Sequence, residues 1–186
     1  MAHGNCCRRG GLFVKLVHDH MPGKETIMEL DPTDLRRALG CFATGVTVVT
    51  CCNKDGDPRG ITANSFSSVS LEPPLILWNI AKVSGSLNAF LQAEFFAINV
   101  LTADQQALSA HFARSDHTLF DGVDYELNAE GAPLLRDSLA VFECRTYQVH
   151  DCGDHHIIVG EVLRFRGDDG EPLLFFGGQY RRLHQD

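Results

Sequence analysis

The segment 60–70 carries many small hydroxyl and amide side chains, in the order GITANSFSSVS. Such side chains leave the backbone accessible, so the segment offers many hydrogen-bond donors and acceptors to a flat, polar heterocycle. The same residue types are common in surface turns, where they bond to their own backbone. From the residues alone, this segment is either a ligand-binding loop or a serine-rich turn.

A second group of reactive side chains lies near the C-terminal end. Its members are types that bind metals, namely His150, Asp151, Cys152, Asp154, His155 and His156. On a regular strand only alternate residues share a face, so His155 and His156 would point apart. Gly153 is also expected to bend the chain. These features disfavour a metal site, so we expect none, and they leave an ordinary polar turn open.

Several well-known nucleotide and hydrolase motifs are absent from the sequence. There is no GxGxxG after a strand, no P-loop, no HExxH and no GxSxG. If the protein uses a nicotinamide nucleotide, it therefore holds the nucleotide without a Rossmann fingerprint.

The elements that must position these residues are mostly strands. Residues 46–50, 59–62, 67–71, 75–80, 95–101, 139–149, 156–165 and 173–176 have strand composition. Helices are expected at 32–44, at 84–91 with Ser84 as its cap, and at 103–112, with a long loop over 113–131. Hairpin-length connections favour a mainly β fold with helical excursions (α+β), built as an antiparallel barrel.

Length and composition indicate one ordinary globular domain. The chain has 186 residues and a net charge of -8, with no basic run, so nucleic acid and anionic membrane are poor partners. No apolar stretch is long enough to span a membrane. Seven cysteines without a CxxC spacing favour free thiols in a reducing cytoplasm.

The first thirty residues differ from the rest of the chain. Lys15 interrupts the apolar stretch 11–14 and no small-residue cleavage pattern follows, which argues against a signal peptide. We expect residues 1–30 to be a poorly ordered extension and residues 31–186 to be the domain. Met28, just before the first helix, is a possible alternative start.

Ordered motifs along residues 33–183 resemble the flavin reductase family, the short-chain NAD(P)H:flavin oxidoreductases that serve as reductase components of two-component flavin monooxygenases. The matching motifs are GVTVVT at 45–50, the whole segment 60–70, PPL at 73–75, FAINVL at 96–101, Gln105, Leu108-Ser109, Phe112-Ala113, Gly153-Asp154-His155 and Tyr180-Arg181. Each motif alone is weak, but their order makes the set specific.

The resemblance implies an FMN-binding type of split β-barrel, usually a homodimer, that binds FMN or FAD. It implies that Thr62, Ala63, Asn64 and Ser65 line the flavin ring, with Ser67 and Ser68 nearby. Ser84 and Ser86 would lie at the flavin phosphate, and simple helix capping is the alternative. Phe112 and Ala113 would adjoin the flavin, and Arg114 either pairs with its phosphate or is a solvated charge.

The same resemblance assigns Gly153, Asp154 and His155 to the nicotinamide nucleotide, NADH or NADPH. His155 is the candidate catalytic residue, positioning the nicotinamide or donating to a phosphate. Tyr180 and Arg181 would contact the nucleotide or close the dimer, while Tyr180 also suits a barrel rim. Trp78, Cys51 and Cys144 are expected in the core or at strand edges.

These expectations define an NAD(P)H-dependent reductase that supplies reduced FMN or FAD to a flavin-dependent oxygenase. Two alternatives stay open. The same fold can pass electrons to ferric iron, a corrinoid or a quinone, or it can serve as a flavin- or haem-binding module without catalysis.

Overall fold

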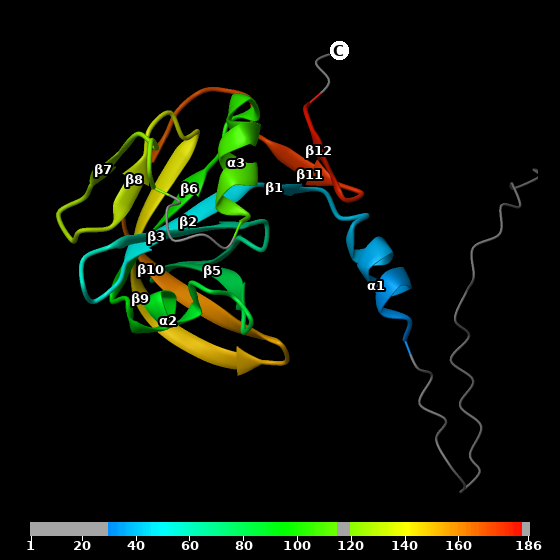
Figure 1. The fold of residues 1–186 in the computed structure, drawn as a ribbon, viewed down its shortest axis with the longest axis horizontal. Coiled ribbons are helices and arrows are strands. Elements are labelled where there is room, and N and C mark those ends of the chain that lie inside the picture. The colour runs from blue at the N-terminus through cyan, green and yellow to red at the C-terminus, as the bar shows by residue number, and fades with distance from the viewer. Residues whose placement is uncertain (1–29, 115–119, 184–186) are drawn as a thin grey trace, which may run out of the picture. The chain divides into compact units, whose positions relative to one another are not determined.

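The β-branched runs of the sequence form the strands of the computed structural model, which describes residues 30–114 and 120–183 (Figure 1). The expected extension at residues 1–30 lies almost wholly outside the described residues and stays a prediction. The mainly β architecture agrees with the sequence analysis. None of the helices in these two ranges is long and apolar enough to cross a membrane.

Seven strands of the described chain form the main sheet, in the order β3-β2-β6-β9-β10-β5-β4. They are β2 (Thr47–Cys52), β3 (Pro58–Ala63), β4 (Ser67–Leu71), β5 (Pro74–Ala81), β6 (Phe95–Val100), β9 (Ala140–Cys152) and β10 (His155–Gly167). Every neighbouring pair is antiparallel. Hairpins join three of the six pairs, β2–β3, β4–β5 and β9–β10, as the short polar connections predict.

The main sheet curves into a barrel that does not close. Its order begins at β3 and ends at β4, and within the described residues these two strands form no ladder with each other. Residues 64–66 connect them without regular structure. We call this opening the split. The fold is therefore the expected split β-barrel, with an open sheet.

The central strands β2 and β6 are buried on both faces, whereas β5 faces the core with alternate residues, as strand geometry requires. On β5, Ile76, Trp78 and Ile80 are buried, while the residues between them are only partly buried. Trp78 packs against Phe90 and Phe96. Cys51 and Cys144 are buried in the same cluster, and burial raises the pKa of each thiol to about 12. The structure confirms these three residues as core.

The first two helices are shorter than the sequence predicts, whereas the third covers the predicted residues 103–112 as a 3₁₀ turn followed by an α-helix. The helices are α1 (Pro32–Leu39), α2 (Leu87–Gln92), η1 (Ala103–Gln105) and α3 (Gln106–Phe112). The first ends before residue 44 because Thr44–Gly45 forms β1, which pairs with β11 (Leu174–Phe176). The prediction that Ser84 caps the second helix is wrong, because the N-cap is Ser86, without a side-chain cap.

Short strands complete the fold. β11 also pairs with β12 (Gln179–Arg181), and β7 (Tyr125–Leu127) pairs with β8 (Pro133–Leu135). β7 lies within the segment predicted as a loop over 113–131. Two- and three-residue strands have too few residues to show an alternation pattern, so the sequence analysis predicted β11 within residues 173–176 but missed β1, β7, β8 and β12.

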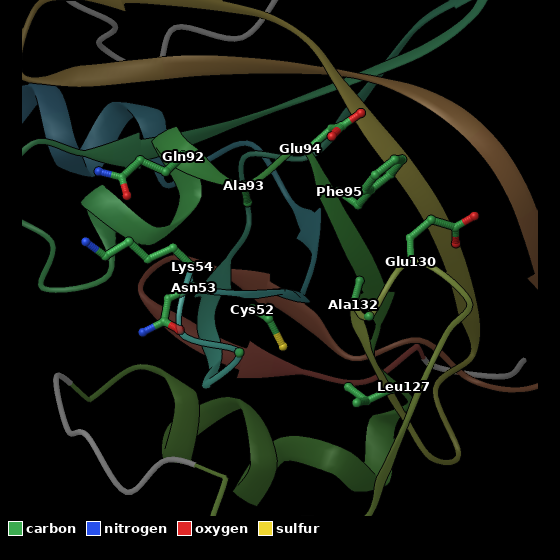
Figure 2. A pocket seen from close by; sticks show the side chains of 12 residues that line it. Cys52, Asn53, Lys54, Gln92, Ala93, Glu94, Phe95, Leu127, Glu130 and Ala132 are labelled. Carbon is green, nitrogen blue, oxygen red and sulfur yellow. The ribbon is translucent and has the colours of Figure 1, made fainter.

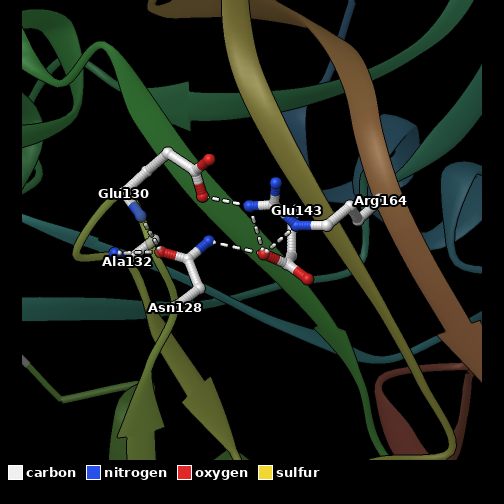
Figure 3. Close-up of polar contacts among 5 residues, drawn as sticks. All are labelled: Asn128, Glu130, Ala132, Glu143 and Arg164. Carbon is white, nitrogen blue, oxygen red and sulfur yellow. Dashed lines mark hydrogen bonds and ion pairs between the residues drawn. The ribbon is translucent and has the colours of Figure 1, made fainter.

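Four polar side chains tie the β7–β8 connection to β9 and β10, and Figure 3 shows them together. Asn128 and Arg164 both donate to Glu143, at 2.7 and 2.9 Å, and Arg164 also pairs with Glu130. The Asn128 Oδ1 accepts the backbone N–H groups of Glu130 and Ala132. We call Asn128, Glu130, Glu143 and Arg164 the polar clamp.

A buried asparagine joins three strands deeper in the same region. The Asn99 Nδ2 donates to the Val48 carbonyl at 3.0 Å and to the Thr50 hydroxyl at 3.1 Å. Its Oδ1 accepts the Leu135 N–H at 2.9 Å. Both ends of this fully buried amide are therefore bonded, linking β2, β6 and β8.

Candidate functional site

A cavity of about 420 Å³ opens at the split, and we call it the split cavity. It is lined by Ile61, Thr62, Ala63, Asn64, Ser65, Asn79, Ala81, Cys152, His155 and Ile157. Five of these were predicted as site residues, namely Thr62, Ala63, Asn64, Ser65 and His155. The fold thus brings together the two polar segments that the sequence analysis singled out.

One wall of the split cavity is the free edge of β3. β3 pairs with β2 on one side, and no strand in the described chain pairs with its other side. A free edge presents backbone N–H and C=O groups that a neighbouring strand would otherwise bond. This wall therefore suits a ligand that carries both donors and acceptors.

The opposite wall comes from β5 and β10, whose register fixes its side chains. Ile157 pairs with Asn79, and His155 pairs with Ala81 on β5 and with Cys152 on β9. Because alternate residues share a face, Asn79 and Ala81 lie on the side of β5 away from the buried Trp78 and Ile80.

Two hydroxyls of the segment 62–65 are already bonded within the protein. Thr62 Oγ1 donates to the Ser109 carbonyl at 2.6 Å, which ties β3 to α3. Ser65 Oγ accepts the Asn79 backbone N–H at 2.9 Å, which ties the segment to β5. These two side chains fix the conformation of the wall. The backbone and the exposed Asn64 side chain are therefore the groups available to bind a ligand.

A second cavity of about 290 Å³ adjoins the first along β3, and we call it the rim cavity. Its lining is Val46, Ile61, Thr62, Asn64, Ser109, Ala113, Phe175 and Tyr180. Ile61, Thr62 and Asn64 line both cavities. The Tyr180 and Ser109 hydroxyls are 2.8 Å apart, and Phe175 packs edge-on against Tyr180. Ala113 and Tyr180, both predicted as site residues, meet here.

His155 follows a two-residue turn between β9 and β10. Gly153 has a φ of 63°, a left-handed conformation that favours glycine at this position of a tight hairpin turn. The Asp154 carbonyl accepts the Lys82 backbone N–H at 2.9 Å, and the Lys82 ammonium pairs with Asp151 at 2.7 Å. The turn is therefore anchored to the end of β5.

The Asp154 carboxylate lies beside the imidazole of His155. The two side chains are 2.7 Å apart, from Oδ1 to Nδ1. This hydrogen bond and the charge of the imidazole lower the pKa of Asp154. With Nδ1 engaged by the carboxylate, Nε2 is the ring nitrogen left for a ligand.

Other predicted residues lie outside the lining of both cavities. Phe112 is completely buried, so its side chain packs beneath the site, where its ring is 5.1 Å from that of Phe120. Arg114 bonds to His111 at the end of α3. The remaining residues in this group are Ser67, Ser68, Ser84, Ser86, Gly153, Asp154 and Arg181.

The sequence analysis missed several lining residues. Residues 75–80 read as a continuous apolar run, which hid the partly exposed face of β5 that carries Asn79. Asn79, a polar residue inside that apolar run, was the signal that could have identified this face. Others are Ile61, Ala81, Cys152 and Ile157 in the split cavity, and Val46, Ser109 and Phe175 in the rim cavity.

A third cavity, of about 410 Å³, contains none of the predicted site residues (Figure 2). Cys52 at the end of β2 and Lys54 in the β2–β3 turn line it, together with Glu94, Phe95 and Leu127. Among the residues that the structure describes, no three His, Cys, Asp or Glu side chains are grouped as metal ligands.

Comparison with known proteins finds one matching family. The flavin reductase like domain family matches residues 39–184. The FMN reductase (NADH) SmoA of Agrobacterium fabrum is 51% identical over 172 residues, which cover 91% of this chain and 95% of that protein.

Other relatives are reductase components of flavin-dependent monooxygenases. The reductase component of the flavin-dependent trigonelline monooxygenase of Acinetobacter baylyi is 45% identical over 147 residues. That match covers 79% of this chain and 47% of the relative, so the chain spans about half the length of that longer protein.

A solved structure has the same fold. The NADH:FAD oxidoreductase of Streptomyces globisporus matches with a TM-score of 0.79 and 42% identity, covering 84% of this chain and 97% of that one. The same protein is also known in complex with NAD and FAD fragments.

Proposed function

The chain belongs to the flavin reductase like domain family and is an NAD(P)H:flavin oxidoreductase, and we propose that the split and rim cavities hold its two substrates. FMN or FAD is the acceptor, and NADH or NADPH is the donor. The observation that carries the proposal is that His155 and the segment 62–65, distant in sequence, line one cavity.

The residues of the split cavity fit a flavin ring. The ring is flat, and its polar edge carries both donors and acceptors, which match the free backbone edge of β3. Asn79 adds an amide whose Oδ1 is buried without a partner among the described residues. When bound, the flavin supplies the ring that accepts a hydride from the nicotinamide.

The protein's own task is to position the two rings. The segment 62–65 binds one ring, and His155 directs its Nε2 toward the other from the opposite side of the cavity. Ile157 and Ala81 supply an apolar surface that excludes water between them. Hydride transfer needs close and correct alignment, and a preformed cavity provides it.

The phosphates lie outside the two cavities in this proposal. Ser84 and Ser86 precede α2, where the Ser84 Oγ accepts the Ser86 N–H at 3.3 Å. We place the flavin phosphate at these hydroxyls, with Ser67 and Ser68 of β4 along the path. Arg114 is a second candidate for the phosphate, since it extends from the end of α3 close to Ala113.

Tyr180 lines the rim cavity, and Arg181 follows it on β12. Tyr180 closes one side of this cavity through its bond to Ser109, and Arg181 is an exposed neighbour on β12 that can meet a nucleotide phosphate. Gly153 and Asp154 act through the turn that carries His155.

We propose a homodimer, because the described residues 30–114 and 120–183 include an exposed apolar surface. On and after α1, Leu35, Leu39 and Phe42 are 46%, 67% and 78% exposed, and α1 has no buried residue. A helix of eight residues is marginal without packing. A second copy of the chain would cover this face.

The relatives that are reductase components imply an oxygenase that receives the reduced flavin. We place the reaction in the cytoplasm, because the described cysteines are free thiols, as expected in a reducing compartment.

The test is oxidation of NADH and NADPH by the purified protein, with and without FMN or FAD. Flavin-dependent oxidation is expected, with the relative rates identifying the preferred pair. Binding of flavin without any oxidation would contradict the proposal and favour a storage role.

A further inference from the structure

The side chain of Asn79 lies on the face of β5 that lines the split cavity. Its neighbours along the strand, Trp78 and Ile80, point into the core. The Asn79 backbone N–H donates to the Ser65 hydroxyl at 2.9 Å, and Ile157 lies opposite on β10. The backbone of Asn79 is therefore fixed between the segment 62–65 and the wall formed by β10, and its side chain is left without a bond to either.

The Asn79 amide is not used by the fold. Its Oδ1 is buried, and it accepts no hydrogen bond within the described residues. Buried polar atoms are usually bonded, and an unpaired one is destabilising. Asn99 shows the ordinary structural use of the same side chain, since three hydrogen bonds engage both ends of its amide.

The other end of the Asn79 amide is open to the cavity. Its Nδ2 makes no hydrogen bond within the described chain, and unlike Oδ1 it is not a buried atom. A half-turn of the amide exchanges the two ends, so the side chain can offer either a donor or an acceptor. The Asn79 side chain thus has an unpaired amide and lines a cavity. An unpaired polar side chain in a cavity lining is typical of a binding function.

We infer that Asn79 binds the polar edge of the flavin ring, an inference that rests on the proposed function of the split cavity. The flavin ring is favoured over the nicotinamide because Asn79 is bonded directly to Ser65, in the wall assigned to the flavin. His155 faces Ala81, the next residue on that face of β5. Asn79 is thus a binding residue for the ring that riboflavin, FMN and FAD share.

Replacing Asn79 by Leu removes the amide and fills the same space with an apolar group. Affinities for riboflavin, FMN and FAD should fall by the same factor, about five- to tenfold, because the three share the ring and one hydrogen bond is lost. The KM for NADH should not change. The Tm should stay the same or rise, since a buried unpaired oxygen is removed. Asn79→Ala is a second variant, because alanine removes the amide without the overpacking that leucine could cause.

The matched control is Asn53→Ala in the β2–β3 turn. The Asn53 side chain bonds to the backbone of Asp55 and Asp57 and to the Asp57 carboxylate. This variant should lower the Tm and leave riboflavin affinity unchanged, which is the signature of a structural asparagine.

The measurements are flavin-fluorescence titration without nucleotide, steady-state kinetics and thermal unfolding of the full chain. An unchanged riboflavin affinity with a lower Tm would overturn the inference and make Asn79 structural. A raised KM for NADH with unchanged riboflavin affinity would overturn it in favour of a nicotinamide contact. Failure of the unmodified protein to bind any flavin would instead contradict the proposed function.

Discussion

The polar clamp and the split both border the seven-stranded sheet, yet their polar groups are used in opposite ways. In the clamp and around Asn99, amides and carboxylates bond to one another and join neighbouring strands (Figure 3). At the split, the edge of β3 is unpaired and Asn79 keeps an unbonded amide. Hydrogen-bonded polar groups stabilise the barrel at the clamp and around Asn99. Unbonded polar groups at the split are available to bind a ligand.

The comparison teaches that stability and binding are separated within this small fold. A substitution in the bonded region should change unfolding and leave substrate affinity unchanged. A substitution at the split should do the reverse. Each prediction below tests one side of this division.

The largest expected effect is on stability, from Asn99→Leu. This change leaves the Leu135 N–H and the Val48 carbonyl without their bonds to a buried amide. Several orphaned groups should lower the free energy of unfolding by about 3–5 kcal/mol. Urea denaturation measures it. A decrease in the free energy of unfolding of less than about 1 kcal/mol would mean that the hydrogen bonds of Asn99 contribute little to stability.

His155→Ala should have the largest effect on catalysis. The KM for the nicotinamide nucleotide should rise by about tenfold, the equivalent of about 1.4 kcal/mol, because one contact to the nucleotide is lost. The KM for flavin and the Tm should change little. Equal changes in both KM values would mean that the imidazole does not belong to the nucleotide side.

Glu143→Gln tests the polar clamp through pH. Burial alone would raise the pKa of Glu143, but hydrogen bonds from Arg164 and Asn128 outweigh it and hold the pKa below its ordinary value of 4.5. A lowered pKa stabilises the fold above pH 4.5, and this contribution disappears as pH falls through the lowered pKa.

The Gln variant should therefore lose about 1 kcal/mol near neutral pH. The difference from the unmodified protein should shrink in acid, as thermal unfolding across pH would measure. A difference that does not depend on pH would show that the charge of Glu143 is not involved.

The smallest expected effect comes from Asp154→Asn. The carboxylate is almost fully exposed, so its bond to His155 only orients the ring. The KM for the nucleotide should rise about two- to threefold. In the double variant with His155→Ala, Asp154→Asn should add nothing further, since the ring it orients is gone. Additive effects would instead indicate a direct contact from Asp154.

The sequence allowed the strand content and the main site segments to be predicted. The residue types of the segment 60–70 and of the turn 153–155 left an ordinary turn open in each case, and the family resemblance assigned both to the site. Residues 62–65 and His155 line one cavity. Helix ends and short strands were missed, because tertiary pairing such as β1 with β11 overrides local propensity.

The lining residues that escaped prediction depend on register. Asn79 lines the cavity only because β5 pairs with β10 so that Ile157 lies opposite it. Phe112 shows the converse, since it belongs to a motif of the family yet is buried beneath the site. Neither position can be read from spacing along the chain.

Backbone hydrogen exchange with and without FMN tests the division between the two regions most directly. Binding at the split should slow exchange at residues 61–65, 79 and 81, which line the split cavity, and leave residues 128–143 unchanged. Slowed exchange around the polar clamp, with residues 61–65 unaffected, would contradict the account and place the flavin elsewhere.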